Sequence, residues 1–163
     1  MFKVEAKHFL TGEELSTSEL AGILDFAAEL KAERKAGRAR STLAGRNVTL
    51  LFEKPSLMTK VSFTVAIQEL GGAVVECQAS TRKHEEPEDL VRVLGGYTHA
   101  IMSRTFEHSI LDRMASKSPV PVINGLSDSH HPCQILADLL TLKEHYGKLE
   151  GLEVAYIGDG NNI

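Results

Sequence analysis

The hydrophobic residues of the chain alternate between short continuous runs and stretches in which they recur every three or four positions. Residues 48–52 form an apolar run of the length expected for a buried strand. After Ser16, by contrast, apolar residues recur with helical spacing, and Glu19 three positions later completes a capping box. This first helix is expected to end near Gly37. The same patterns predict strands over residues 73–77, 100–102, 120–123 and 154–157, and helices over residues 56–70, 87–95, 109–115 and 132–146.

The predicted strands and helices alternate along the chain. Such alternation is typical of an α/β fold with a parallel sheet and right-handed crossovers. In open parallel sheets, ligands bind beyond the carboxyl ends of the strands. Three polar segments follow predicted strands and are expected at that edge, namely residues 53–56, 103–105 and 124–127. The polar turn predicted at residues 125–128 leads to His131-Pro132-Cys133-Gln134, where the last long helix begins.

Composition and charge narrow the class of protein. The chain has 163 residues, of which 42% are hydrophobic and 25% charged, as in ordinary globular domains. The formal net charge of −4 and the lack of a long Lys/Arg run argue against a nucleic-acid-binding protein. Cys77 and Cys133 have neither metal-ligand nor disulfide spacing, which suits a reducing cytosol. The charged first residues do not resemble a signal peptide, and no apolar run approaches the ~20 residues that span a bilayer, so we expect a cytoplasmic protein without membrane contact.

The last segment of the chain differs from the rest. Residues 154–162 have the pattern of a strand that enters a glycine turn, as at the start of a second nucleotide-type domain. A final strand with no helix behind it would leave one face of its sheet uncovered. We therefore interpret residues 1–150 as one binding domain and residues 151–163 as the first strand and turn of a truncated second domain.

The start of the helix predicted at residues 56–70 could bind an anion. Backbone N–H groups are unpaired in the first turn of a helix, and the helix dipole adds about half a positive charge there. Ser56 and Thr59 add hydroxyl groups, and Lys60 adds a cation. A helix-capping Ser beside a surface Lys would have the same spacing, so both interpretations stay open. No glycine-rich loop precedes the helix, which argues against a Walker A site.

Other candidate binding residues stand at a strand end and at a helix start. Arg104 follows a predicted strand, where its guanidinium could give two parallel hydrogen bonds to phosphate or carbonyl oxygens, although a surface ion pair is the commoner role. His131 and Gln134 stand in the first turn of the last long helix and could hold a carbonyl or amide group. Cys133 has no evident base partner and is expected to be a packing residue. The nearby histidines lack the Cys or carboxylate spacing of a metal site.

Several short segments match the pattern of a known family. They are residues 52–56 together with 61–63, 103–106, 124–128, 131–134 and 157–162. On these segments the chain, from about Leu10 onward, resembles the N-terminal, carbamoyl-phosphate-binding half of the aspartate/ornithine carbamoyltransferase family. Cys133 and the Gly-Asn-Asn turn are similar to the ornithine type rather than the aspartate type. With this resemblance we expect a three-layer α/β/α domain whose four-stranded parallel sheet has the flavodoxin-like strand order 2-1-3-4.

The resemblance also implies a reaction and its residues. Members of the family transfer the carbamoyl group of carbamoyl phosphate to an amine, here L-ornithine, giving L-citrulline and phosphate without a cofactor or a metal. They form trimers or assemblies of trimers, so the loop of Lys83 and His84 would reach toward a neighbouring subunit. Asn162 would help to bind ornithine. Carbamoyl phosphate would bind to Ser56, Leu57, Met58, Thr59, Lys60, Arg104, Thr105, His131 and Gln134, with Arg104, His131 and Gln134 in the catalytic roles.

Two departures from the family pattern limit what this chain is expected to do. The family's first segment reads Ser-Thr-Arg-Thr-Arg or Ser-Leu-Arg-Thr-Arg, whereas this chain has Met58 in place of the central Arg and Lys60 in place of the last. Loss of a charge-assisted contact to phosphate costs about 2–5 kcal/mol, and Lys lacks the forked donors of Arg. The ornithine-binding half is also missing after Ile163, so we expect this chain alone to be inactive.

Two other functions fit the same residues. One is a carbamoyltransferase with another amine acceptor, because acceptor specificity would lie in the missing half. The other is a non-catalytic paralogue that acts as an oligomerising or anion-binding module, because such a protein would be expected to lose the Arg at position 58.

Overall fold

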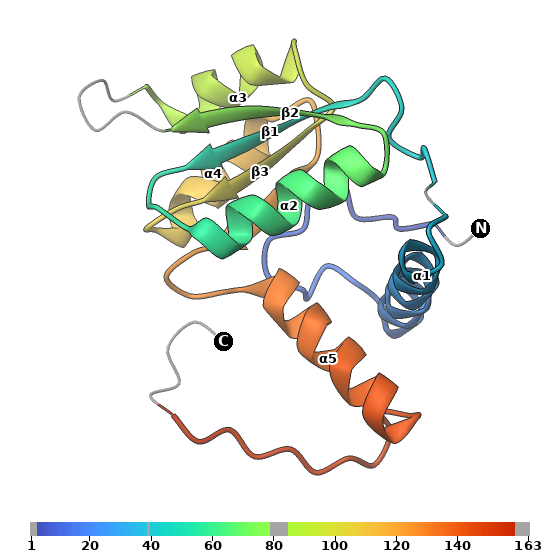
Figure 1. The fold of residues 1–163 in the computed structure, drawn as a ribbon. Coiled ribbons are helices and arrows are strands. Elements are labelled where there is room, and N and C mark those ends of the chain that lie inside the picture. The colour runs from blue at the N-terminus through green and yellow to red at the C-terminus, as the bar shows by residue number, and fades with distance from the viewer. Residues whose placement is uncertain (1–2, 39, 79–84, 159–163) are drawn as a thin grey trace.

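The computed structural model describes residues 3–38, 40–78 and 85–158 and contains a sheet of four parallel strands (Figure 1). The strands are β1 (Asn47–Phe52), β2 (Ala73–Gln78), β3 (Ala100–Arg104) and β4 (Val122–Leu126). The helices are α1 (Thr17–Lys35), α2 (Leu57–Glu69), α3 (Pro87–Gly95), α4 (His108–Lys117) and α5 (Pro132–Tyr146). The strand order is β2-β1-β3-β4, which confirms the predicted sheet. Among these five helices, none is long and apolar enough to cross a lipid bilayer.

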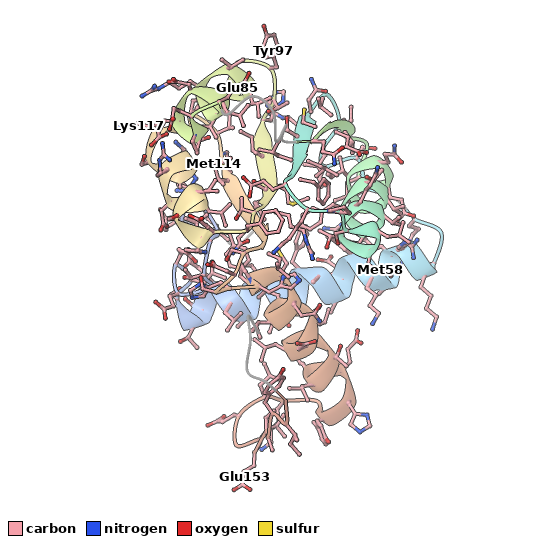
Figure 2. All side chains as sticks on the ribbon, turned by 90° about the vertical axis from the view of Figure 1, so that its left-hand side faces the viewer. Met58, Glu85, Tyr97, Met114, Lys117 and Glu153 are labelled. Carbon is pink, nitrogen blue, oxygen red and sulfur yellow. The ribbon has the colours of Figure 1, made fainter. Side chains whose placement is uncertain are left out.

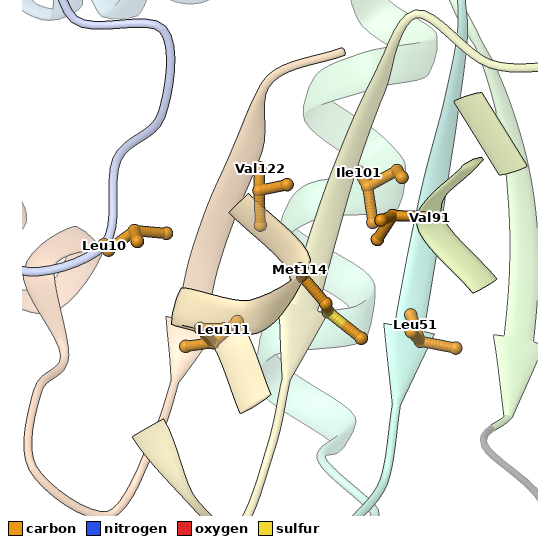
Figure 3. Close-up of a cluster of buried hydrophobic side chains, with 7 residues drawn as sticks. All are labelled: Leu10, Leu51, Val91, Ile101, Leu111, Met114 and Val122. Carbon is orange, nitrogen blue, oxygen red and sulfur yellow. The ribbon is translucent and has the colours of Figure 1, made fainter. Parts of the chain in front are cut away.

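Helices cover both faces of the sheet, which confirms the three-layer prediction. Figure 1 shows α3 and α4 behind the sheet and α2 in front of it, while α1 packs on α5 below α2. Because side chains alternate along a strand, Leu51 faces α3 and α4 whereas Leu50 and Phe52 face α2. The buried cluster on the α3 and α4 side contains Leu10, Leu51, Val91, Ile101, Leu111, Met114 and Val122 (Figure 3).

The helix ends follow the local signals in the sequence. Before α1, the Ser16 hydroxyl accepts a hydrogen bond from the Glu19 N–H at 3.2 Å, and the Glu19 carboxylate accepts one from the Ser16 N–H at 2.8 Å. The Ser16 hydroxyl also donates to the Glu19 carboxylate at 2.6 Å, and this bond, followed by those from the backbone N–H groups of Glu5 and Ser16, lowers the pKa of Glu19 to about 2. The predicted capping box is therefore confirmed. At the other end of the chain, α5 stops at Gly147, whose φ of 79° is the left-handed conformation that favours glycine.

The segment before α1 lies along the free edge of β4. The Phe9 N–H donates to the Val122 carbonyl at 2.9 Å, and the Asn124 N–H donates to the Phe9 carbonyl at 2.8 Å. The Val122 N–H donates to Nδ1 of His8 at 3.1 Å. Residues 8–10 thus satisfy backbone groups that an uncovered edge strand would expose.

Because His8 accepts a hydrogen bond through Nδ1, its protonation should weaken the β4 edge. Burial, and then the positive charge of Lys7, lower the pKa of His8 below its ordinary value of 6.5. Between the folded-state pKa and 6.5, the unfolded chain binds more protons, so the free energy of unfolding falls as the pH falls through this window. The His8→Asn variant keeps an acceptor but does not titrate. We expect a flatter pH dependence of its free energy of unfolding between pH 7.5 and 5, measured by urea denaturation.

A control for this prediction is His8→Ala, which removes the acceptor as well as the titrating group. We expect it to be less stable than His8→Asn at each pH, because the Val122 N–H loses its partner. Curves for the native chain and His8→Asn that run parallel across the window would contradict a role for His8.

The structure corrects the predicted bounds of the last core strand. Residues 125–128 were expected to form a turn after a strand at residues 120–123, but Gly125 and Leu126 belong to β4. Gly125 packs so closely on β3 that a Cβ atom there would lie 2.3 Å from the Met102 sulfur. A shift in register between Ser103 and Arg104 then lets Leu126 pair with Arg104. Glycine was taken as a turn signal, whereas here it permits a close approach of two strands.

The strand predicted over residues 154–157 is also wrong for this chain as folded. These residues have no regular structure, and Val154 and Ile157 are 70% and 97% exposed. A strand needs a neighbour to satisfy its backbone groups, and within the described ranges no strand pairs with this segment. The assignment of residues 151–163 to a second domain stays a prediction, and residues 159–163 lie outside the described part of the chain.

Candidate anion-binding site

The predicted site residues gather where β1, β3 and β4 end. Arg104 is the last residue of β3 and pairs in register with Phe52, the last residue of β1. The chain leaves β1 and begins α2 at Leu57, directly after the N-cap Ser56. After β4, the loop of residues 127–131 leads into α5, whose N-cap is His131. The expectation that these segments meet at the carboxyl edge of the sheet is therefore confirmed.

Arg104 is a half-buried cation for which the described part of the chain supplies no carboxylate partner. Its Nη1 donates to Oγ1 of Thr59 at 2.9 Å, whereas its buried Nε has no hydrogen-bond partner. Within the described ranges, no Asp or Glu forms an ion pair with it, and burial alone accounts for the lowering of its pKa. A charged group that is partly removed from water and unpaired costs free energy unless a ligand completes its surroundings. The position of Arg104 is therefore suited to an anion.

Two more titratable nitrogen groups, the Lys54 ammonium and the His131 imidazole, lie close to Arg104. Burial and the charge of Arg104 lower the pKa of Lys54, whose Nζ also lies 5.2 Å from the centre of the Phe106 ring. Burial and the charge of Arg104 likewise lower the pKa of His131, whose buried Nδ1 has no hydrogen-bond partner. The charge of Arg104 thus disfavours the protonated forms of Lys54 and His131, and a bound anion would favour them. Lys54 was not among the predicted site residues, although its place two residues after the end of β1 is a signal that could have identified it.

The first turn of α2 presents its predicted residues in different directions. The Ser56 hydroxyl donates to Oγ1 of Thr59 at 2.9 Å, so both hydroxyls lie beside Arg104. Leu57 and Met58, by contrast, are 75% and 77% exposed, and Figure 2 shows Met58 at the outer end of α2. The Lys60 Nζ donates to Oε1 of Glu76 on β2 at 2.5 Å. Lys60 is thus engaged with an acid, whereas Thr59 contacts the cation predicted to share its ligand.

Thr105 and Gln134 are also placed near the strand ends, but their polar atoms already have partners. The buried Thr105 donates through Oγ1 to the Glu107 carbonyl at 3.0 Å. Gln134 donates through Nε2 to Asp138 at 2.8 Å, within α5. Lys83, His84 and Asn162 lie outside the described residues. Across residues 3–38, 40–78 and 85–158, no group of three or more His, Cys, Asp or Glu side chains is arranged to hold a metal ion.

A buried hydrogen-bond network, centred on Asn124, fixes the loop that carries His131. The Asn124 side chain donates to the carbonyls of Leu10 and His130 at 2.8 and 3.2 Å, and it accepts from the Leu126 N–H at 2.9 Å. Ser127 extends the network, because its hydroxyl accepts from the His130 N–H at 3.2 Å. Sequence reasoning missed this role of Asn124, and the only local signal was a polar residue inside an otherwise apolar strand.

The backbone beside this network is strained, and α4 helps to hold it. Leu126 has a φ of +146°, which L-residues rarely adopt and which costs on the order of 1–3 kcal/mol. From α4, the Nδ1 of His108 lies 2.9 Å from the Ser127 hydroxyl, and the His108 N–H donates to Asp128 at 2.9 Å. Strain that the surroundings maintain is common beside ligand sites, and here it sets the direction in which the loop leaves β4.

Comparison with known proteins gives a consistent family match. Residues 7–144 match the family model described as "Aspartate/ornithine carbamoyltransferase, carbamoyl-P binding domain". The ornithine carbamoyltransferase of Acidothermus cellulolyticus is 50% identical over 160 residues, which is 96% of this chain and 51% of that protein. The chain therefore spans about half the length of the curated relatives that it matches.

Solved structures show the same relationship. The ornithine carbamoyltransferase from Pyrococcus furiosus superimposes with a TM-score of 0.95 at 38% identity, over 100% of this chain and 53% of that one. Aspartate transcarbamoylase from Trypanosoma cruzi, solved with N-(phosphonacetyl)-L-aspartic acid, matches with a TM-score of 0.88 at 28% identity, over 96% of this chain and 50% of that one. The similarity thus extends to relatives whose names give different acceptors.

Proposed function

The chain belongs to the aspartate/ornithine carbamoyltransferase family, and from this premise we propose that it binds carbamoyl phosphate as the donor half of an ornithine-type enzyme. The main support is Arg104, a half-buried guanidinium that forms no ion pair with a carboxylate of the described residues and that has Lys54 and His131 close by. Two cations and an imidazole, with Thr59 in contact with one of the cations, suit a small phosphorylated ligand. The complete reaction, which joins ornithine and carbamoyl phosphate to give citrulline and phosphate, would also need the part of the relatives that this chain does not cover.

The proposed chemistry follows from where charge develops. An uncharged amine attacks the carbonyl carbon and a C–N bond forms. As the tetrahedral intermediate collapses, the C–O bond breaks with its electron pair on phosphate, and the amine nitrogen loses a proton that the departing phosphate can accept. Negative charge grows on the carbonyl oxygen and on the leaving phosphate. Arg104 and His131 would donate to the carbonyl oxygen, and the free N–H groups in the first turn of α2 would bind the phosphate. Gln134, which now donates to Asp138, would turn its amide oxygen to the carbamoyl NH2.

The remaining assignments extend beyond the described part of the chain. We propose that Lys83 and His84 reach the site of a neighbouring subunit in a homotrimer, and that Asn162 helps to bind ornithine.

A different amine acceptor is the first alternative function, since the aspartate transcarbamoylase of Trypanosoma cruzi matches this half as well. A non-catalytic, anion-binding paralogue is the second alternative. It is favoured by the exposed Met58, which has no donor, and by the engagement of Lys60 with Glu76.

Calorimetric titration of carbamoyl phosphate into the native chain and into Met58→Arg tests the proposal. We expect the native chain to bind and the variant to bind about 10- to 150-fold more tightly, since one hydrogen bond to a charged group contributes about 1.5–3 kcal/mol. Val61→Arg is the matched control, because Val61 is a further exposed apolar residue of α2, one turn away. Binding by Met58→Arg alone would favour the non-catalytic alternative. If neither the native chain nor Met58→Arg bound the ligand, the proposal would be wrong.

A further inference from the structure

Two neighbouring residues in the first turn of α2 contact side chains of opposite charge. Thr59 accepts from Arg104 at 2.9 Å, whereas Lys60 donates to Glu76 at 2.5 Å. The turn that is proposed to bind phosphate is therefore held by a cation from β3 and by a carboxylate from β2. A carboxylate beside an anion site lowers the affinity for a negatively charged ligand, so Glu76 should oppose the binding of phosphate here.

The register of the sheet shows why both side chains reach the same helix. Glu76 pairs with Leu50, and Arg104 pairs with Phe52. Leu50 and Phe52 both belong to the buried cluster under α2, so their neighbours on β2 and β3 face the same helix. Glu76 therefore lies two residue positions further from the carboxyl ends of the strands than Arg104. The Lys60 ammonium group is therefore held at Glu76 on β2, away from the carboxyl ends of the strands, whereas the Thr59 hydroxyl contacts Arg104 at the end of β3.

We propose that Glu76 limits the affinity of this site for phosphorylated ligands by engaging Lys60 and by placing a negative charge beside the bound anion. This inference rests on the proposed function, which it extends to the control of ligand affinity. The side chains of Lys60 and Glu76 are each 46% exposed, so water and salt weaken their attraction. A doubly charged ligand can therefore draw Lys60 away from Glu76, but it binds less tightly than it would to a free Lys60.

The expected size of the effect follows from the exposure of the pair. Exposed ion pairs change an equilibrium by no more than about fivefold, and removal of a nearby like charge adds a similar factor. Glu76→Gln should therefore bind carbamoyl phosphate about three- to tenfold more tightly than the native chain. The gain should shrink as salt is added, because screening reduces both contributions.

Calorimetric titration of carbamoyl phosphate into the native chain, Glu76→Gln, Lys60→Gln and the double variant tests the inference. Lys60→Gln should bind more weakly than the native chain, and most of the gain from Glu76→Gln should disappear in the background of Lys60→Gln. Glu69→Gln is the matched control, since it removes the same charge from the last residue of α2, where Glu69 pairs with Arg34. It should leave the affinity unchanged.

Each outcome decides between the inference and the proposed function. A Glu76→Gln variant that binds no better than the native chain, or no better than Glu69→Gln, would overturn the inference while the proposed function stands. An equal gain with and without Lys60 would overturn the part assigned to Lys60. Binding by Glu76→Gln but not by the native chain would support the inference. If neither of those two bound the ligand, the proposed function would be wrong, and the inference with it.

Discussion

Replacement of Arg104 by Gln is expected to weaken carbamoyl phosphate binding by about 30-fold to several thousandfold, since loss of a partly buried charged donor costs about 2–5 kcal/mol. The guanidinium is half-buried, contacts Thr59 and lacks a carboxylate partner within the described ranges, so a bound anion would be its main counter-charge. Arg104→Lys should lose less affinity, because it keeps the charge but not the forked donors. Calorimetric titration measures both changes.

The matched control for Arg104 is Arg113→Gln on α4, where the guanidinium pairs with Glu86 and Glu88 on the surface. Its affinity for carbamoyl phosphate should equal that of the native chain. Thermal unfolding should show that Arg104→Gln is no less stable than the native chain, since the change removes a buried Nε that has no partner. Native affinity in Arg104→Gln would remove the main support for the proposed function.

The largest loss of stability is expected from Asn124→Ala. The side chain is fully buried, with contacts to the backbone of Leu10, Leu126 and His130, and its removal leaves at least one of these groups unsatisfied. Each buried unsatisfied group costs about 1–3 kcal/mol, so we expect the free energy of unfolding to fall by about 2–4 kcal/mol, measured by urea denaturation. Ligand affinity should also fall, because this network holds the loop before His131.

Asn47→Ala provides the comparison for this change. The Asn47 amide makes a longer bond of 3.4 Å, to the Tyr97 carbonyl near the opposite edge of the sheet. We expect a loss of less than about 1 kcal/mol there, since water can replace an exposed hydrogen bond. Equal losses in the two variants would show that the network around Asn124 has no special role.

Most helices and strands could be predicted because their signals are local. The capping box of Ser16 and Glu19 and the glycine after α5 specify helix ends within a few residues, and the structure has both. Apolar runs also marked the buried strands. Where a feature depends on distant contacts, prediction from sequence was incomplete. Gly125 lies in a strand because of its contact with Met102, and residues 154–157 find no strand to pair with among the described residues.

The candidate site shows the same division. The position of Arg104 and His131 at the strand ends followed from the order of strands and loops. Whether Arg104 has an ion-pair partner among the described residues, by contrast, depends on which acids the fold brings near it, and the sequence has no signal for this. Likewise, nothing in the sequence around Lys60 indicated Glu76, because the two meet only through the pairing of β1 and β2. Local motifs thus locate a site, while tertiary contacts determine its charge.

The alignment of residues 8–10 with β4 has a consequence for the order of folding. His8 and Val122, like Leu10 and Asn124, are joined across 114 positions of the chain. Contacts of such separation raise the contact order and form slowly, since a long loop must close before they can stabilise anything. The pairing of β1 with β2 and β3 is far more local. We therefore expect the ligand-binding loop, which Asn124 joins to Leu10, to be among the last parts of the domain to reach its final shape during synthesis.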